Sequence, residues 1–393
     1  MRTLFEHQQK AIERLSRYRV GALFMEPGTG KTATAHQLVA SANPAAVLWM
    51  CPKQTIATVQ RELALCGGFD CPVHFVAVES LSASSRAYLA ARDICAAENT
   101  FLVCDESLKI KNWTAIRTRR AIKLGKLAEW RLILNGTPLS RNLLDLWAQM
   151  EFLSPRILQM SLARFKRTYC ETIEYYKKNV MVGEQIVAYH NVPHLYSLIA
   201  PYVFECDLQM GDLSKVYLSI PWQPTDDDRE RYSELKNFWL KEERLSELNN
   251  NIFLQMCQNM QHSYCASPAK LQALGKVLAS GRRTIVFCKF LDSAAAVRDT
   301  FPDVTVLTFG RHAFGLNLQD HQQVVFFDQT WDYAQRIQAE GRIWRKGQTD
   351  TCYFVDLFGQ FPLEKIIIEN IQRKEHLLDL VQREGAEKIA AAL

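Results

Sequence analysis

The chain has 393 residues, of which 48% are hydrophobic and 23% are charged. This composition is typical of a folded globular protein and excludes a disordered chain, and the length favours two or three domains. The 47 lysines and arginines against 42 aspartates and glutamates give a net charge of +5, which permits a nucleic-acid partner without implying one. No run of apolar residues is long enough for a transmembrane helix, so we expect no membrane span.

The eleven cysteines are spread along the chain without the rhythm of a disulfide framework. Residues 1–15 have an amphipathic helical pattern that carries too many charges for a signal peptide. We therefore expect a reducing, cytoplasmic compartment. Cys257, His262 and Cys265 are three possible metal ligands, but a closed structural zinc site needs a fourth, so no structural zinc is expected.

The first 150 residues alternate short apolar runs with amphipathic helical patterns. Strands are predicted at residues 20–26, 46–52, 73–78, 100–106 and 131–137. Continuous apolar strands separated by helices indicate a parallel sheet that is covered on both faces. Residues 1–150 are therefore predicted to form a first α/β domain.

The second part of the chain has two different patterns. Residues 151–267 are charged and rich in helical and turn signals, which predicts a helical insertion and linker. The β/α alternation resumes over residues 268–361, and residues 362–393 are predicted to form a helical tail. Strands are predicted at 284–290, 304–309, 322–328 and 352–357, and a helix across 334–344. The expected fold class is α/β, with two related domains.

The segment MEPGTGKT, residues 25–32, follows a predicted strand and opens a predicted helix. Glycines let backbone N–H groups wrap around phosphate oxygens, and a helix N-terminus favours negative charge. Lys31 would reach the β and γ phosphates of a nucleotide, and the Thr32 hydroxyl would coordinate Mg²⁺. A glycine-rich turn followed by chance by Lys-Thr is the alternative, which the strand–loop–helix context disfavours. The loop residues expected at the nucleotide are Pro27, Gly28, Thr29 and Gly30.

The pair Asp105–Glu106 stands at the end of the strand predicted at 100–106. A phosphate loop needs an acid at the end of a neighbouring strand to hold its metal ion. Asp105 would then bind Mg²⁺, and Glu106 would orient and deprotonate the attacking water. Taken alone, an Asp-Glu pair also fits the polar end of a buried strand, but the preceding phosphate loop favours the chemical role.

These motifs, in this order, resemble those of the superfamily 2 nucleic-acid motors, and within them the SWI/SNF-like branch that includes annealing helicases and many phage helicases. The resemblance covers nearly the whole chain. Gln8 in LFEHQQKAI matches the family glutamine that reads the adenine edge. Lys53 in CPKQTIATVQREL matches a residue near the tracked strand. DESLKIKN and LILNGTPLSRNLLDLW resemble motifs II and III, which place Asn112 and Thr137 at the same strand.

The second half of the chain carries the most specific match. FGLNLQ resembles motif V, with Gly315 expected at the nucleotide and Asn317 at the nucleic acid. FDQTWDYAQRIQAEGRIWRKGQ, residues 327–348, fits the last family motif closely, with Trp331 expected to grip the strand. Arg342 and Arg345 are expected on one helical face, where both would reach the γ-phosphate as arginine fingers, with Gln338 one turn earlier. The alternative is a salt-bridged surface helix.

The resemblance implies two RecA-like lobes, ATP and Mg²⁺ as cofactors, and DNA as the partner. It implies an ATP-dependent DNA helicase or translocase that moves along duplex, forked or branched DNA in replication, recombination or repair. The contacts to the DNA backbone would be sequence-tolerant and salt-sensitive. A monomer is expected. The basic residues 117–126 are either a further DNA contact or a solvated helix face.

Three departures from the family pattern bear on function. Leu108 replaces the histidine of motif II, and the linker has PYVFECDL, residues 201–208, where chromatin remodellers carry an Arg-Arg-x-Lys signal. Only residues 291–312 separate two motifs of the second lobe, so that lobe is expected to be unusually small. These features favour a compact bacterial enzyme, or a phage enzyme in the host cytoplasm, over a nucleosome remodeller. Two alternatives stay open: an ATP-gated DNA clamp or scaffold with little turnover, and a DEAD-box RNA helicase, which the last motif disfavours.

Overall fold

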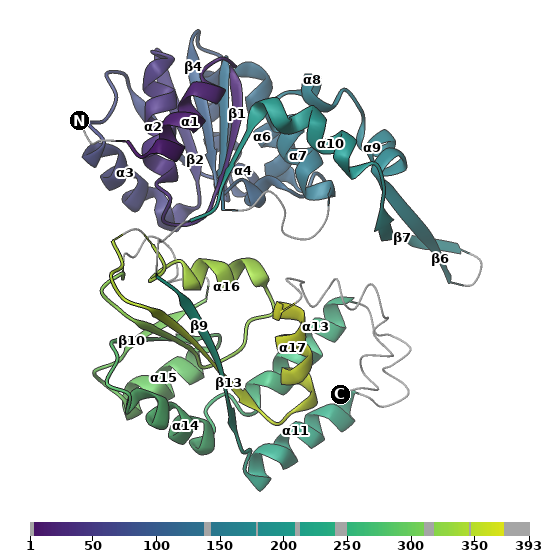
Figure 1. Cartoon of the computed structure of the whole chain (residues 1–393). Helices are drawn as coiled ribbons and strands as arrows, with labels where there is room; N and C mark the ends of the chain where they lie inside the picture. Colours follow the sequence, from purple (N-terminus) through teal and green to yellow (C-terminus); the bar gives the residue numbers. More distant parts are fainter. Residues whose placement is uncertain are drawn as a thin grey trace. The chain divides into compact units, whose positions relative to one another are not determined.

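The computed structural model describes residues 4–136, 143–177, 180–208, 213–239, 250–309, 318–345 and 347–372. The chain divides into two compact units, Met1–Gln209 and Met210–Leu393, which we call unit 1 and unit 2. Each unit is built around one parallel β-sheet flanked by helices (Figure 1). Among the described residues, no helix combines the length and the apolar character that a membrane crossing requires.

Unit 1 contains a six-stranded sheet in the order β3-β2-β4-β5-β1-β8. All its strand pairs are parallel, so every strand ends at the same edge. Asp105 at the end of β4 is in register with Leu134 of β5, and Asn135 of β5 is in register with Phe24 of β1. The strands are β1 (Val20–Met25), β2 (Ala46–Cys51), β3 (Val73–Ala77), β4 (Thr100–Asp105), β5 (Trp130–Asn135) and β8 (Val203–Cys206).

Helices cover both faces of this sheet. Alternate residues of each strand point to opposite faces, and the apolar side chains on both faces are buried against helices. Leu23 and Met25 pack with α1–α3, whereas Ala22 and Phe24 belong to the core on the other face. The first face carries α1 (Glu6–Leu15), α2 (Lys31–Ser41) and α3 (Ile56–Leu65). The second core includes residues of α4 (Ser80–Ala83), α5 (Ser85–Cys95), α6 (Ile116–Leu127) and α7 (Leu144–Leu153).

A further part of unit 1 lies between α7 and β8. It comprises α8 (Pro155–Leu158), α9 (Leu162–Tyr169), the antiparallel hairpin of β6 (Cys170–Lys177) and β7 (Val180–Tyr189), α10 (Val192–Ile199) and the 3₁₀ turn η3 (Ala200–Tyr202). The hairpin extends beyond α9 in Figure 1. Phe165 and Tyr169 of α9 are fully buried and anchor this part to the core of unit 1.

Unit 2 contains a five-stranded parallel sheet in the order β11-β10-β12-β13-β9. Its strands are β9 (Lys215–Trp222), β10 (Thr284–Cys288), β11 (Thr305–Thr308), β12 (Gln323–Phe326) and β13 (Cys352–Gly359). Its helices are α11 (Asp226–Trp239), α13 (Asn250–His262), α14 (Pro268–Leu278), α15 (Leu291–Thr300), α16 (Tyr333–Glu340) and α17 (Pro362–Gln372).

A buried ion pair joins three elements of unit 2. Lys270 in α14 donates a hydrogen bond of 2.6 Å to Asp328, and both side chains are fully buried. The other carboxylate oxygen of Asp328 accepts from the backbone N–H groups of Lys289 (2.8 Å) and Phe290 (3.3 Å). Removing one partner of such a pair leaves a buried charge without compensation, at a cost of about 3–5 kcal/mol. Asp328 therefore fixes the ends of β10 and β12 against α14.

The structure confirms the predicted α/β class and all the predicted strands, with shifts at their ends. The boundaries of the domains differ from the prediction. The segment 151–267 is divided between the two units, because β8 joins the first sheet and β9 pairs with β13 in the second. Unit 2 is therefore larger than the 268–361 predicted for the second lobe. Of the predicted tail, α17 is described, and the rest lies outside the described residues.

Candidate nucleotide site

The loop between β1 and α2 has the backbone conformation that a phosphate loop requires. Gly28 and Gly30 have φ angles of 90° and 83°, in the left-handed region that favours glycine. The Thr29 hydroxyl donates a hydrogen bond of 2.7 Å to the Glu26 carbonyl and closes the loop on itself. The helix α2 begins directly after Gly30, at Lys31. Its first N–H groups and its dipole thus follow the loop, as anion binding at a helix N-terminus requires.

The start of α1 holds this loop from one side. The Gln8 amide donates hydrogen bonds to the carbonyls of Thr29 (3.3 Å) and Gly30 (3.2 Å), and its oxygen accepts from the Phe5 N–H at 3.0 Å. The His7 ring nitrogen lies 2.9 Å from the same Thr29 carbonyl. Gln8 is buried and bound to the loop backbone, while its predicted contact with adenine stays a prediction. The part played by His7 was not predicted, because no motif marks it.

Glu26 fastens the other side of the loop to the last strand of unit 1. Its backbone N–H donates to the Cys206 carbonyl at 3.0 Å, and its carboxylate accepts from the Leu208 N–H at 2.9 Å. Both partners lie at the end of β8, about 180 residues away along the chain. The phosphate loop is therefore connected to the segment that leads from unit 1 into unit 2.

The predicted acid pair lies at the same edge of the sheet as the loop. Burial and, after it, the neighbouring Glu106 carboxylate raise the pKa of Asp105 to about 7, against the opposing effect of the Lys31 ammonium. Lys31 also approaches Gly136 at the end of β5, where a Cβ would lie 3.9 Å from its Nζ. The structure thus brings Lys31 and Asp105 together. A carboxylate and the Thr32 hydroxyl are hard oxygen ligands, so the residues present fit Mg²⁺.

Glu106 has an unusual backbone conformation. Its φ and ψ angles are both 53°, which is left-handed and costs a non-glycine residue about 1–2 kcal/mol. Its N–H donates to the Asp105 carboxylate at 2.9 Å, and its carbonyl accepts from Lys109 at 2.8 Å. These bonds hold the strained residue at the start of the 3₁₀ turn η2 (Ser107–Ile110). The strained backbone therefore belongs to the residue that was predicted to be the general base.

The turn η2 is anchored to α7 by a buried polar contact that was not predicted from the sequence. The Ser107 hydroxyl donates to the Gln149 side-chain oxygen at 2.6 Å, and both residues are fully buried. On the same helix, Asp145 lies 3.7 Å from the Lys111 ammonium. Leu108, between these contacts, is half-buried and offers no hydrogen-bonding side chain. Motif II is thus positioned by α7 on either side of Leu108.

Asn135 is the buried polar residue at the end of β5. Only 3% of it is exposed, and its oxygen accepts a hydrogen bond of 2.8 Å from the Gly136 N–H. Its amide nitrogen is buried and has no hydrogen-bond partner among the residues that the structure describes. An unsatisfied amide of this kind costs about 1–3 kcal/mol. Asn135 is the last residue of β5, which lies between β1 and β4, and it is therefore close in the sheet to the phosphate loop and Asp105.

The residues predicted to contact nucleic acid have different surroundings. Lys53 is exposed at the 3₁₀ turn η1 (Lys53–Thr55), and its backbone N–H donates to Glu79 at 3.2 Å. The Asn112 oxygen accepts from both the N–H (3.0 Å) and the hydroxyl (2.7 Å) of Thr114. Lys53 and Asn112 follow β2 and β4, so they lie at the same edge of the sheet as the acid pair. Thr137, Gly315 and Asn317 lie outside the described residues.

The arginines of unit 2 do not share a helical face as predicted. The helix α16 ends at Glu340, so Arg342 and Arg345 lie in the turns that follow it, while Gln338 is in its last turn. The prediction was wrong because it continued the helical period through Gly341. The side chain that stabilises the end of α16 is Arg336, which donates to Glu340 at 2.9 Å and to Asp356 at 3.1 Å. Arg342 is buried, and Arg345 is half-buried.

Gln348 orders the turns that carry these arginines. Its amide donates to the carbonyls of His321 (2.9 Å) and Ile343 (3.2 Å). Its oxygen accepts from the N–H groups of Thr349 (3.0 Å) and Asp350 (3.1 Å). These four bonds go to backbone atoms. The glutamine of the RKGQ sequence is therefore a positioning residue for the loop after α16.

Trp331 packs inside unit 2. It is 8% exposed, and the Lys289 ammonium lies 3.5 Å from the centre of its ring. Lys289 donates to Gln261 at 2.6 Å, and burial lowers the pKa of Lys289 to about 7. A direct contact between Trp331 and a nucleic acid would require the ring to become exposed.

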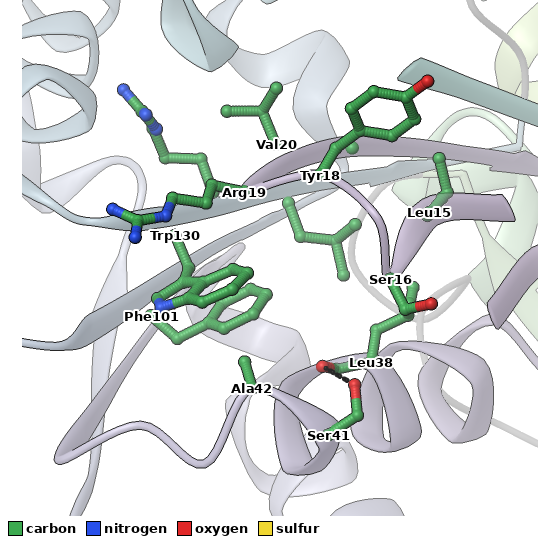
Figure 2. A pocket seen from close by; sticks show the side chains of 13 residues that line it. Leu15, Ser16, Tyr18, Arg19, Val20, Leu38, Ser41, Ala42, Phe101 and Trp130 are labelled. Carbon is green, nitrogen blue, oxygen red and sulfur yellow. Dashed lines mark hydrogen bonds between the residues drawn. The ribbon is translucent and has the colours of Figure 1, made fainter. Parts of the chain in front are cut away.

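A separate cavity of about 120 Å³ lies at the opposite edge of the sheet of unit 1. Phe101 and Trp130, which both line it, are stacked on each other (Figure 2). Their ring centres lie 6.1 Å apart, and the Arg19 guanidinium lies 5.6 Å from the centre of the Trp130 ring. The strand residues in its lining come from the starts of β1, β4 and β5, whereas the phosphate loop follows the end of β1. The cavity therefore does not belong to the nucleotide site.

The fold and the site define the class of this protein: a chain of two parallel-sheet units, the first with a phosphate loop and an acid pair at one sheet edge. Comparison with known families shows what the chain is similar to. Residues 74–263, slightly under half of the chain, match the SNF2-related domain. Over these residues the predicted resemblance to SWI/SNF-like motors is confirmed.

Individual relatives are distant in sequence. The chain is 22% identical to an uncharacterized ATP-dependent helicase of Mycoplasma pneumoniae, over 71% of this chain and 30% of that protein. It is 23% identical to the ISWI chromatin-remodeling complex ATPase ISW2 of Saccharomyces cerevisiae, over 75% of this chain and 31% of that one. The chain thus spans less than a third of the length of these relatives. A SWI2/SNF2 ATPase core of Sulfolobus solfataricus in complex with dsDNA aligns with a TM-score of 0.46 and 18% identity, over 99% of this chain and 95% of that one.

Proposed function

We propose that this chain is an ATP-dependent DNA translocase that hydrolyses ATP to move along duplex, forked or branched DNA. The observation that supports this best is the group of Lys31, Asp105 and Glu106 at one sheet edge in a chain with an SNF2-related domain. The proposal extends to ATP and Mg²⁺ as cofactors, to DNA as partner and to a monomeric protein. It also extends to a role in replication, recombination or repair in the bacterial cytoplasm, or in that of a phage host.

The residues of unit 1 have distinct roles in the proposed hydrolysis. The loop N–H groups hold the phosphates, and the Lys31 ammonium balances the charge of the β and γ phosphates. Asp105 and Thr32 would hold Mg²⁺, which when bound neutralises charge on the phosphate oxygens. The Glu106 carboxylate would accept a proton from the attacking water, whose oxygen forms the new bond to the γ-phosphorus. The bond from the γ-phosphorus to the β,γ-bridging oxygen breaks in the same reaction, so ADP leaves with that oxygen and inorganic phosphate is released. The strained backbone of Glu106 keeps this carboxylate at the end of β4.

Unit 2 would complete the site when ATP is bound. Arg342 and Arg345 would stabilise the negative charge that develops on the transferred phosphoryl group, and Gln338 would orient them. ATP binding would bring the two units together and hydrolysis would release them. With Lys53, Asn112 and Thr137 on one unit and Asn317 on the other, each cycle would shift two backbone grips along the DNA. Binding of this kind is sequence-tolerant and weakens with salt.

The test is ATP turnover with Mg²⁺, measured without nucleic acid and with single-stranded, duplex, forked and RNA substrates. Stimulation by duplex or forked DNA is expected, and stimulation by none of the nucleic acids would refute the proposal. Stimulation by RNA alone would favour an RNA helicase. Displacement of a triplex strand from duplex DNA, and of one arm of a fork, then separates translocation from strand separation.

Three variants connect turnover to the site. Lys31→Ala removes the phosphate-binding ammonium and is expected to abolish turnover, while Glu106→Gln is expected to bind ATP without hydrolysing it. Lys276→Ala, an exposed lysine in α14, is the matched control and should leave turnover unchanged. Circular dichroism should show the same folded state for all of them. Normal turnover by Lys31→Ala would show that the nucleotide binds elsewhere.

One observation favours a second candidate, an ATP-gated DNA clamp with little turnover. Leu108 occupies the motif II position from which the family histidine connects hydrolysis to the opposite lobe, and a leucine cannot hydrogen-bond there. A clamp would retain DNA tightly with ATP bound and release little phosphate. Tight ATP-dependent retention without phosphate release would establish the clamp, and rapid DNA-stimulated turnover would establish the translocase.

A further inference from the structure

Three potential metal ligands converge on unit 2, away from the nucleotide site. His262 is the last residue of α13, Cys265 lies in the following turn, and Asp292 is in the first turn of α15. Their ligand atoms all lie within 4.8 Å of one another. The closest pair is His262 Nε2 and Asp292 Oδ2, at 2.9 Å. The group therefore combines a nitrogen, a sulfur and an oxygen from two helices and the turn that follows one of them.

The surrounding structure holds these residues in place. The Cys265 N–H donates to the His262 carbonyl at 3.1 Å, so a tight turn brings both side chains to the end of α13. The Ser293 hydroxyl donates to the Cys265 carbonyl at 3.2 Å and fixes that turn against α15. Phe290 packs edge-to-face on the His262 ring, at 4.9 Å between ring centres. The ligands are thus positioned by contacts other than those among themselves.

The donor set fits a borderline-soft divalent cation such as Zn²⁺ better than Mg²⁺, which prefers oxygen ligands throughout. Bonds of about 2.0–2.3 Å in a tetrahedral site would place the ligand atoms roughly 3.5 Å apart. The His262–Asp292 pair, at 2.9 Å, would therefore open slightly, and any wider pair within the 4.8 Å group would close. Cys265 is buried, whereas the side chains of His262 and Asp292 are 48% and 67% exposed. Because they are exposed, the side chains of His262 and Asp292 can adjust their positions around a metal ion that is bound to the buried Cys265 sulfur.

The charges of the group also fit a cation. A thiolate and a carboxylate together offset the charge of a divalent ion, and the neutral imidazole adds none.

We propose that His262, Cys265 and Asp292 form an open binding site for a zinc-like divalent cation, with water as the fourth ligand. The bound ion would fasten the end of α13 to the start of α15. The sequence alone marked Cys257 with His262 and Cys265 as potential ligands. The structure places Cys257 in the core beside Met256 and Met260, and Asp292 takes its place in the group.

Cobalt titration of the purified full chain tests this site. Co²⁺ bound to a thiolate has a charge-transfer absorption band that oxygen-only sites lack. A band that saturates at one Co²⁺ per chain, and that Zn²⁺ removes, is expected. His262→Ala and Asp292→Asn should each weaken Co²⁺ binding by more than about tenfold, and Cys265→Ser should remove the band. The exposed positions of His262 and Asp292 make these two variants informative even if Cys265→Ser fails to fold.

Two controls separate this site from other cysteines and from the nucleotide site. Cys257→Ala and Asp105→Asn should both keep the band and its stoichiometry. Zn²⁺ should raise the melting temperature of the natural protein but not that of His262→Ala, because a ligand stabilises only the folded state that binds it. Absence of the band in the natural protein, or a band that survives Cys265→Ser or both exposed variants, would overturn the proposal. The outcome does not depend on ATP turnover or DNA binding.

Discussion

The Ser107 hydroxyl and the Gln149 side-chain oxygen form a hydrogen bond of 2.6 Å, with both residues fully buried. This contact connects the turn after the acid pair to α7, the helix that begins within the motif III segment. Gln149 in turn donates to the Asp145 carbonyl of its own helix at 3.0 Å, so its amide is oriented. The position of Asp105 and Glu106 therefore depends on a helix that contains none of the predicted catalytic residues.

Replacing Gln149 with methionine is expected to lower the free energy of unfolding by about 1–3 kcal/mol, because the buried Ser107 hydroxyl loses its acceptor. Ser107→Ala together with Gln149→Met should cost less than the sum of the single changes, with a coupling of about 1 kcal/mol. Urea unfolding of the four proteins measures this. Ser82→Ala, which removes an exposed hydroxyl bonded to Glu79, should change stability by less than about 0.5 kcal/mol. Strictly additive losses would show that the two side chains do not interact.

The pKa of Asp105, raised to about 7 by burial, predicts how metal binding depends on pH. Below about pH 7 a proton competes with Mg²⁺ for this carboxylate, so the Mg²⁺ concentration for half-maximal turnover should rise up to about tenfold per pH unit. Above about pH 7 it should level off. Turnover measured against Mg²⁺ from about pH 6 to about pH 8 tests this. A Mg²⁺ requirement independent of pH would contradict the assignment.

The same shift predicts a loss of stability as pH rises. The pKa of Asp105 in the folded state lies above its ordinary value of 3.8, so between these values the folded chain binds more protons than the unfolded chain. Stability is therefore greatest below about pH 4 for this group and declines as the pH approaches 7. Asp105→Asn should remove this component. Urea unfolding at several pH values should show a shallower decline for Asp105→Asn than for the natural protein, and identical slopes would count against the shift.

Gly30 is expected to tolerate no side chain. Its φ is 83°, and a Cβ would collide with the Gln8 amide nitrogen. Gly281 is the matched control, since its φ is 70° but a Cβ there would meet nothing within 4 Å. Gly281→Ala should cost about 1 kcal/mol from backbone strain alone. Gly30→Ala should cost more and should also displace α1 from the loop, with loss of binding of a fluorescent ATP analogue. Equal costs and normal nucleotide binding would show that Gln8 is not held as described.

The strands and the phosphate loop could be predicted because their signals are local. An apolar run such as residues 20–26 and the glycines after it lie within a few positions of one another. Contacts between distant residues could not be predicted in this way. Gln149 meets Ser107 from 42 positions away, Leu208 meets Glu26 from 182 positions away, and β9 joins unit 2 through β13. A local sequence pattern does not indicate such partners, because these contacts form only when the chain folds into its tertiary structure.

The arginines after Trp331 show the same limit within one motif. Helical spacing grouped Arg342 with Arg345, but the helix ends before both, and it is Arg336 that lies in α16. Arg336 is 4% exposed, pairs with Glu340 and Asp356, and stacks 3.5 Å from the centre of the Phe326 ring. Through these contacts, the buried guanidinium holds α16 against β13 and β12.

The two kinds of arginine are therefore expected to respond differently to substitution. Arg336→Met removes the guanidinium from the buried Glu340 and the half-buried Asp356. Because Glu340 keeps its contacts with Lys215 and Tyr217, the free energy of unfolding should fall by about 3 kcal/mol. Arg345→Met, at a half-buried position after the helix, should change stability by less than about 1 kcal/mol but reduce DNA-stimulated turnover at least about a hundredfold. Urea unfolding and ATP turnover, measured on both variants, separate the two effects. A stable Arg336→Met protein would contradict the structural role of Arg336, and a fully active Arg345→Met protein would contradict the role of Arg345 in hydrolysis.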